Sequence, residues 1–167
     1  KYAIEEHPDL IINIVDATSI ERSLYLTTQL LELDTKVIIA LNMSDMLEKK
    51  NIKIDEKILE KYLHTTTIKI SALKNTGIDE LIEIIKNDEE EDNLHLPIYE
   101  QKVEEVISTI MRIKQVNRFE AVKILERDER YEHMITDSIR YLIEKLEIEY
   151  GYDTEQMIAN QRYNYIE

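Results

Sequence analysis

The sequence has 167 residues, of which 43% are apolar, enough for a hydrophobic core in one domain or two small ones. Lys and Arg number 21 against 35 Asp and Glu, and the resulting formal charge of -14 argues against a nucleic-acid partner, because phosphate contacts need basic residues. The absence of cysteine excludes disulfides, thiolate metal sites and cysteine nucleophiles, and no apolar run approaches the roughly 20 residues that span a bilayer.

Three strands and two connecting helices are predicted in the first half of the chain. An apolar run from Leu10 to Val15 predicts a buried strand that ends at Asp16. A helix capped by Thr18 or Ser19 should run to about residue 33, and the second strand is Val37 to Leu41. This strand, helix, strand unit implies a right-handed parallel crossover. The apolar face of the helix is formed by Leu24, Leu26, Leu30, Leu31 and Leu33.

Three further helical segments and a third strand are predicted after the second strand. We expect a short helical piece over 46–49, a helix capped by Asp55 that runs to about Leu63, and a third strand from Thr66 to Ile70. Asp79 can open the next helix, which continues to about Lys86. The positions expected to face inward are Ile58, Leu59 and Tyr62 or Leu63 in the first of these helices, and Leu81, Ile82, Ile84 and Ile85 in the second.

An acidic segment then divides the chain. The run Asn87 to Asn93 is rich in Asp and Glu, and Pro97 closes it, which favours a solvated linker over a metal site. We therefore predict an α/β domain over 1–87, a linker over 88–97 and a helical domain over 98–167. The four histidines are scattered without the spacing of metal ligands, so no metal site is assigned.

In the second half of the chain the sequence pattern predicts consecutive helices and no strand. A long amphipathic helix ends near Val116, and Asn117 with Glu120 forms a capping box that opens a short one. A third helix covers Ile135 to Ile148 and ends before Gly151, and Asp153 is a capping-box candidate for the last helix. The inward positions are Val103, Val106, Ile107, Ile110 and Ile113 in the first helix, and Ile139, Leu142, Ile143 and Leu146 in the third.

The best candidate site follows the second strand, where Asn42 is succeeded three residues later by Asp45. Both residues are common in turns, so the pair alone is a weak signal. Its place strengthens it, because open α/β sheets bind ligands at the carboxyl ends of their strands. A carboxylate there can accept two hydrogen bonds from the neighbouring N–H donors of guanine, and adenine presents the opposite pattern.

A second part of this site is expected after the third strand. Ser71 and Ala72 offer backbone N–H groups at the end of a neighbouring strand, close to the Asn42 to Asp45 loop. Such groups could donate to the guanine carbonyl oxygen. The alternative, a serine that merely ends a strand, stays open at this point.

These motifs resemble a known family. The residues NMSD at 42–45 and SALK at 71–74, with Gly77, look like the base-specificity segments of a GTPase domain. The stretch NIVDATSIERSLYLTTQLLEL at 13–33 resembles more specifically the prokaryotic ferrous iron transport protein B (FeoB) family. Met43 fits that family, and the segments at 118–126 and 158–167 are similar to its helical domain.

The resemblance implies the carboxyl-terminal half of a P-loop GTPase-type α/β sheet, followed by an all-α helical domain. The implied ligand is GTP or GDP, with the guanine base held by Asn42, Met43, Asp45, Ser71 and Ala72. In the family the phosphate-binding loop, both switches and the Mg²⁺ ligands precede the part that matches Lys1. Gly77 and Gly151 are the only glycines, and they are too far apart to form a GxxxxGK[ST] loop.

The implied role is a cytosolic guanine-nucleotide-binding regulatory part of a ferrous iron transporter. Its helical domain would modulate GDP release, and its partner would be a transmembrane part beyond Glu167, at the cytoplasmic face of the membrane. The sequence leaves open whether the protein forms a homo-oligomer. The alternative is a non-catalytic protein-interaction module with an α/β half and a helical bundle. A receiver domain or a nucleotide-sugar binder would need an acidic phosphorylation pocket or a glycine-rich turn, and the sequence shows neither.

Overall fold

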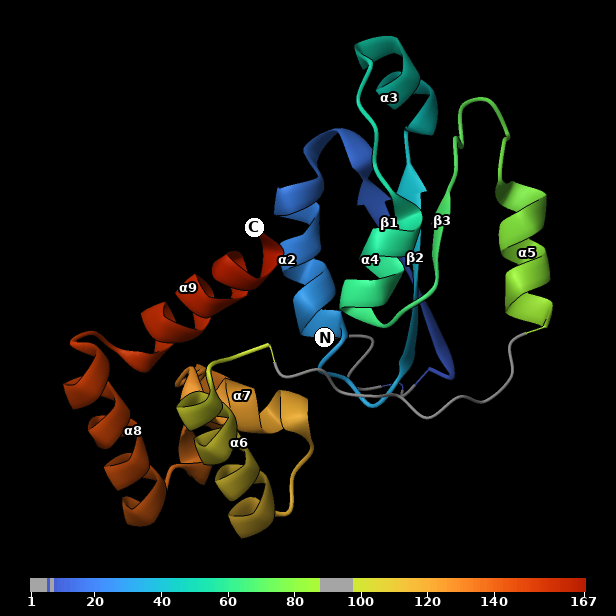
Figure 1. Cartoon of the computed structure of the whole chain (residues 1–167). Coiled ribbons are helices and arrows are strands. Elements are labelled where there is room, and N and C mark those ends of the chain that lie inside the picture. Colours follow the sequence, from blue (N-terminus) through green and yellow to red (C-terminus); the bar gives the residue numbers. More distant parts are fainter. Residues whose placement is uncertain (1–5, 7, 88–97) are drawn as a thin grey trace. The chain divides into compact units, whose positions relative to one another are not determined.

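The computed structural model describes residues 6, 8–87 and 98–167, so the predicted linker lies outside the described residues. The chain divides into two compact units, each taken for its described residues: Lys1–Leu31 with Thr35–Leu96, and Glu32–Asp34 with Pro97–Glu167 (Figure 1). The first unit is α/β and the second is helical. None of the helices among the described residues is long and apolar enough to cross a bilayer.

The first unit contains a parallel sheet with the strand order β1-β2-β3. Its strands are β1 (Leu10–Asp16), β2 (Lys36–Asn42) and β3 (Thr67–Lys69). Asp16 pairs with Asn42 across β1 and β2, and Leu41 pairs with Lys69 across β2 and β3. Because all three strands are parallel, their carboxyl ends meet at one edge of the sheet, where a ligand is expected.

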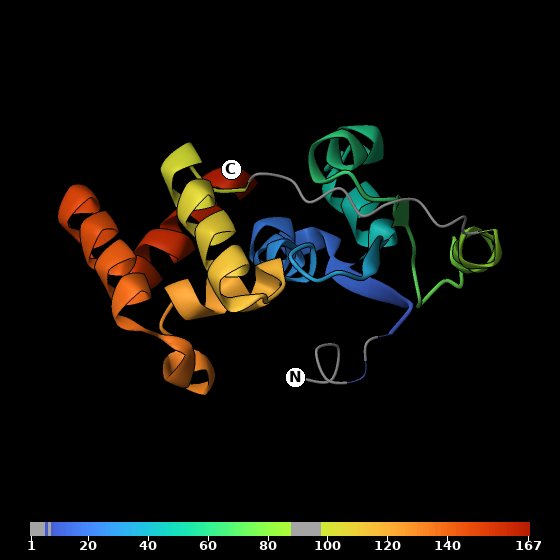
Figure 2. The ribbon, with the colours of Figure 1, turned by 90° about the horizontal axis from the view of Figure 1, so that it is seen from below.

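Helices cover both faces of this sheet. Figures 1 and 2 show α2 (Ile20–Leu30) and α4 (Glu56–Leu63) on one face and α5 (Ile78–Lys86) on the other. Ile38 and Ala40 of β2 pack with Leu81 of α5, and β2 is buried throughout from Val37 to Leu41. A strand covered on both faces needs a continuous apolar run, and for this reason β2 was predictable. β1 was also expected to be buried, but Ile12 and Ile14 are 40% and 66% exposed, because β1 is an edge strand of the described sheet.

Several side chains expected inside this unit are exposed. Ile58 and Tyr62 of α4 are 53% and 64% exposed, whereas Leu63 is buried. The cause is that Glu56 and Glu60 of α4 accept hydrogen bonds from backbone N–H groups of β3 at 2.9 and 3.0 Å. These carboxylates satisfy the N–H groups of the sheet's last described strand, and they turn the face with Ile58 and Tyr62 to solvent.

The predicted apolar face of α2 is also wrong in part. Leu26 is 53% exposed, and the buried residues of this helix are Leu24, Thr27 and Thr28. Thr27 Oγ1 accepts a 2.6 Å hydrogen bond from the Asn13 side chain of β1, so a polar pair occupies the place expected for leucine. Ile82 and Ile113 are exposed as well, at 41% and 46%.

Some helix starts also differ from the prediction. α3 spans Ser44–Lys50, so Asp45 lies in its first turn and not before it. Gly77, and not Asp79, occupies the N-cap position of α5. Ser19 makes no side-chain cap to α2; the Asp16 carboxylate caps the preceding 3-10 turn η1 (Ala17–Ser19) instead. Asp55 does cap α4, by accepting from two backbone N–H groups, as predicted.

The second unit is built from α6 (Gln101–Lys114), α7 (Arg118–Leu125), the 3-10 turn η2 (Glu129–Met134), α8 (Asp137–Tyr150) and α9 (Thr154–Ile166). The capping box of Asn117 and Glu120 is confirmed, and Gly151 ends α8 in the left-handed conformation. The core is apolar, and its fully buried members include Ile107, Ile124 and Ile158.

Candidate functional site

The end of β2 leads into a tight turn at the carboxyl edge of the sheet. Met43 follows Asn42 with a φ of 65°, in the left-handed region, and its carbonyl accepts from Met46 N at 2.9 Å. Ser44 N donates to the Ile70 carbonyl, just beyond β3, at 3.1 Å. The turn between β2 and α3 is therefore fixed by the neighbouring strand.

Asp45 is a buried carboxylate in this turn, with only 6% of its surface exposed. Its Oδ1 accepts a hydrogen bond from Ser71 Oγ at 2.8 Å. Its Oδ2 is also buried and has no hydrogen-bond partner among the described residues. The Lys49 ammonium lies 3.9 Å from Oδ2, but this side chain is 62% exposed, so the ion pair is weak. One oxygen of Asp45 is thus held in place and the other can accept further hydrogen bonds.

The loop after β3 is closed on itself. Ser71 N donates to the Thr76 carbonyl at 3.0 Å, and Thr76 N donates back to Ser71 at 3.1 Å. Gly77 follows with a φ of +74°, and a Cβ at this position would lie 2.3 Å from the Lys69 carbonyl oxygen. Only glycine fits such a close backbone approach without a shift of the main chain.

Asn42 and Ala72 join the two loops directly. The Ala72 N–H donates to Asn42 Oδ1 at 3.1 Å, although the two residues are 30 positions apart in the sequence. The N–H groups expected to point at a ligand are therefore both engaged within the protein, that of Ser71 by Thr76 and that of Ala72 by Asn42. The Ala72 N–H is bonded to the Asn42 side chain, which can rotate away and leave this N–H open to a ligand.

The structure thus brings Asn42, Asp45, Ser71 and Ala72 together at one edge of the sheet, with Met43 beside them and 43% exposed. The arrangement combines a buried carboxylate oxygen with a backbone N–H held by a side chain that can move. Chemically, it can accept hydrogen bonds from adjacent N–H groups of a planar ligand and can donate one to its carbonyl oxygen.

Other polar residues near this edge have local roles. The Asp16 carboxylate accepts from Thr18 N at 2.8 Å and from the Thr18 hydroxyl, and these bonds hold the pKa of Asp16 below its usual value. Among the described residues no cluster of three or more acidic or histidine side chains could hold a metal ion. The described residues of this edge therefore do not fit the Mg²⁺ that the resemblance implies.

Models of known protein families match both units of the chain. A model described as "Ferrous iron transport protein B" matches residues 1–85, and a model described as "FeoB cytosolic helical domain" matches residues 99–167. The chain belongs to the FeoB family. The family resemblance predicted from the sequence is confirmed for both units.

Known FeoB proteins agree with this assignment. The chain is 40% identical over 100 residues to the Fe(2+) transporter FeoB of Salmonella typhimurium and 41% identical to that of Escherichia coli K12. Each match covers 60% of this chain but only 13% of the relative, so the chain spans a small part of these transporters.

Solved FeoB structures cover nearly the whole chain. The NFeoB structure of S. thermophilus bound to GDP·AlF4- and K+ is 34% identical with a TM-score of 0.91, and the match covers 99% of this chain and 70% of that one. A second structure of S. thermophilus NFeoB, bound to mGMPPNP, is 34% identical with a TM-score of 0.88. It covers 99% of this chain and 67% of that one.

The sequence reasoning missed one polar cluster in the second unit of this FeoB chain. Glu32 and Arg162 are both fully buried and form an ion pair at 3.0 Å. Two local signals could have found them. Glu32 interrupts the apolar run Leu30 to Leu33, and Arg162 falls at the inward spacing of four residues after Ile158.

Proposed function

We propose that this chain is the base-reading and regulatory part of a guanine-nucleotide-binding module in a ferrous iron transporter. The observation that carries the proposal is Asp45 Oδ2, a buried carboxylate oxygen without a hydrogen-bond partner among the described residues. Leaving such an acceptor unpaired costs about 1–3 kcal/mol. A ligand with adjacent N–H donors would remove that cost, and guanine has them on its Watson-Crick edge.

The proposed binding step uses groups that the structure already holds in place. Asp45 accepts the two N–H groups of the base while Ser71 keeps its other oxygen oriented. The Asn42 side chain turns away from the Ala72 N–H, which then donates to the guanine carbonyl oxygen. Adenine would place an acceptor against the carboxylate and an amino group against the N–H, so both contacts would be mismatched. Met43 lies beside the base and shields it from water.

The proposal extends to the intact protein because this chain spans only a small part of its curated relatives. The nucleotide phosphates and Mg²⁺ would be held by segments that this sequence does not contain. The relatives carry the description Fe(2+) transporter, and S. thermophilus NFeoB has been solved with GDP·AlF4- and with mGMPPNP. We propose that the helical unit modulates GDP release and passes the nucleotide state to a transmembrane part, at the cytoplasmic face of the membrane.

Nucleotide binding to the intact protein tests this proposal. We expect GDP to bind at least about 100-fold more tightly than ADP, because the wrong base leaves buried polar groups unpaired. Isothermal titration with both nucleotides measures the ratio. Equal affinities would contradict the guanine assignment and would favour the alternative of a protein-interaction module.

A further inference from the structure

Helix α4 presents only cationic and apolar side chains to solvent. Its exposed residues are Lys57, Ile58, Lys61 and Tyr62, and no acid is among them. Ile58 is 53% exposed and Tyr62 is 64% exposed. Residues four positions apart lie on one side of a helix, so the two lysines form one stripe and the two apolar residues form the neighbouring one. We call these four residues the α4 face.

The acidic residues of α4 point toward the sheet instead. Glu60 accepts a hydrogen bond from Thr67 N at 3.0 Å. Glu56 accepts from Lys69 N at 2.9 Å and pairs with the Lys69 ammonium at 3.0 Å. An ordinary surface helix turns its charged side to water and its apolar side to the core. In α4 both carboxylates serve β3, and two large apolar side chains are left outside.

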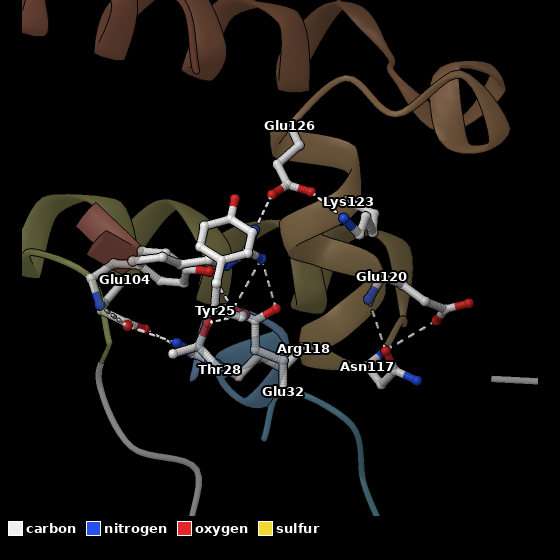
Figure 3. A network of polar contacts seen from close by, with 11 residues as sticks. Tyr25, Thr28, Glu32, Glu104, Asn117, Arg118, Glu120, Lys123 and Glu126 are labelled. Carbon is white, nitrogen blue, oxygen red and sulfur yellow. Dashed lines mark hydrogen bonds and ion pairs between the residues drawn. The ribbon is translucent and has the colours of Figure 1, made fainter. Parts of the chain in front are cut away.

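The lysines of the α4 face have no carboxylate partner. Lys57 forms no ion pair with another described residue, and Lys61 lies over the ring of Tyr62 at 5.9 Å. Buried cations of the second unit are paired by contrast, as Arg118 is with Glu104 at 2.7 Å (Figure 3). The positive charge of the α4 face is therefore available to an anionic partner.

A hollow adjoins the amino end of this face. It has a volume of about 720 Å³, and Lys57 lines it together with Lys53 and with Ile52, which is 44% exposed. The two carboxylates in its lining are already engaged, because Asp55 accepts from backbone N–H groups of α4 and Glu56 bonds to β3. The hollow thus offers two ammonium groups beside an apolar side chain, and this combination suits the phosphate headgroup of a lipid.

The small size of the α4 face favours a bilayer over a protein as its occupant. A helix of eight residues is about 12 Å long, whereas a specific protein interface buries about 800 Å² and 20–30 residues on each side. Apolar side chains that project from a helix need a matching groove in a protein partner, but a bilayer interface accepts them anywhere. Ile and Tyr flanked by Lys are typical of interfacial helices.

We propose that the α4 face docks on the anionic lipid surface of a membrane. Ile58 and Tyr62 enter the boundary of the acyl chains, and Lys53, Lys57 and Lys61 contact lipid phosphates. Because the chain carries a charge of -14, an anionic bilayer repels most of its surface and attracts this face, so charge sets the orientation. The docking rests on the proposed function for the nearness of a membrane. Tethering to a transporter raises the local concentration, so a weak affinity suffices.

Vesicle binding of the 167-residue chain tests the docking. The chain is sedimented with vesicles of phosphatidylglycerol and phosphatidylcholine, and with vesicles of phosphatidylcholine alone. We expect binding to the anionic vesicles only, and its loss at about 0.5 M salt, where the Debye length is about 4 Å. Lys57→Gln with Lys61→Gln should weaken binding about 25-fold, which is about fivefold for each lysine.

The matched control makes the same change of charge elsewhere. Lys86→Gln with Lys145→Gln removes two other exposed lysines and should weaken binding less than about twofold. Circular dichroism confirms that both double variants keep the helix content of the parent. Equal binding by the two double variants would overturn the proposal, as would equal binding of the parent to the neutral vesicles.

A fluorescent probe at Ile58 distinguishes insertion into a bilayer from electrostatic attraction. The chain has no cysteine, so Ile58→Cys can be labelled at one place with a dye whose emission shifts to the blue in apolar surroundings. Anionic vesicles should shift this emission. They should not shift that of a dye at Ile82→Cys, which is 41% exposed in α5 on the other face of the sheet (Figure 1). An Ile58 dye that stays in water while the chain sediments would overturn the proposal and favour an acidic protein segment as the occupant.

Amide hydrogen exchange extends the test to the intact protein, reconstituted in bilayers with and without phosphatidylglycerol. Docking should slow exchange over residues 56–63 about threefold when the anionic lipid is present, while α5 over 78–86 keeps its rate. Equal exchange over 56–63 in both bilayers would contradict the docking. None of these measurements involves a nucleotide, so a failure to prefer GDP over ADP would count against the proposed function alone.

Discussion

Asp45 and Glu32 are both buried carboxylates, one in each unit, but their hydrogen bonding differs. Asp45 uses one oxygen to accept from Ser71, and the other has no hydrogen-bond partner among the described residues. Glu32 accepts at both oxygens, from Tyr99 and Arg162. The comparison teaches that burial alone does not mark a binding site. The oxygen that lacks a donor indicates a ligand, whereas the fully paired carboxylate indicates a structural anchor.

The largest expected effect comes from breaking the paired carboxylate. Glu32→Ala removes a carboxylate that pairs with the fully buried Arg162 and should lower the free energy of unfolding of the helical unit by about 3–5 kcal/mol. Denaturant unfolding followed by circular dichroism measures the loss. Glu149→Ala, in the exposed pair with Lys102, is the control and should leave the free energy of unfolding nearly unchanged. Similar losses in both variants would remove the distinction between the buried Glu32–Arg162 pair and a surface pair.

The next effect concerns the loop that orients Ser71. Gly77→Ala forces a side chain into the left-handed region and places its Cβ 2.3 Å from the Lys69 carbonyl, so it should cost about 3–4 kcal/mol. Gly151→Ala has a similar φ of +78° but nothing within 4 Å, and it should cost only about 1–2 kcal/mol. Thermal unfolding of both variants separates the steric clash from the backbone strain. Equal costs would show that the close approach at Gly77 is relieved by a small shift.

A smaller effect tests the partner of Asp45. Ser71→Ala removes the only hydrogen-bond donor that the described residues give to the Asp45 carboxylate, and it should weaken GDP binding by about 1–3 kcal/mol. Isothermal titration measures it. Ser138→Ala, which removes an exposed hydroxyl bonded only to Thr136 among the described residues, should change binding by less than about 0.5 kcal/mol. An unchanged affinity in Ser71→Ala would mean that Asp45 is held by other means.

The smallest effect comes from a partly buried carboxylate that is paired with an exposed arginine. Hydrogen bonds from Arg130 lower the pKa of Asp128 from 3.8 to about 2. Because the folded pKa is the lower one, the stabilisation is complete above pH 3.8 and is lost as the pH falls through 2. Arg130 is 57% exposed, so the total is less than about 1 kcal/mol. The stability difference between the parent and Asp128→Asn should therefore shrink between pH 4 and pH 2; a difference that stays constant would contradict the assignment.

Features encoded locally were predictable from the sequence. The buried strand β2 follows from a continuous apolar run. The caps at Asp55 and Asn117 follow from side chains that bond backbone groups two or three residues away. The proximity of Asn42 and Ala72 was also predictable, although 30 residues separate them, because parallel strands bring their carboxyl ends to one edge.

Features that depend on tertiary partners were not predictable. The outward face of α4 follows from Glu56 and Glu60 bonding to the N–H groups of β3, which no helical periodicity contains. The Glu32–Arg162 pair joins residues 130 positions apart, so the local sequence can indicate that each residue is buried but not that they are partners. The engagement of the Ala72 N–H by Asn42 is likewise a rotamer choice that only the assembled loops determine.

The most direct test of the central claim is the base preference of Asp45→Asn in the intact protein. An amide can donate to the extra carbonyl of xanthine but no longer accepts both N–H groups of guanine, so binding should shift from GDP to xanthosine diphosphate. Asp55→Asn, which changes an exposed helix cap in the same unit, is the control and should keep the preference for GDP. An unchanged GDP preference in Asp45→Asn would contradict the assignment of Asp45 as the guanine reader.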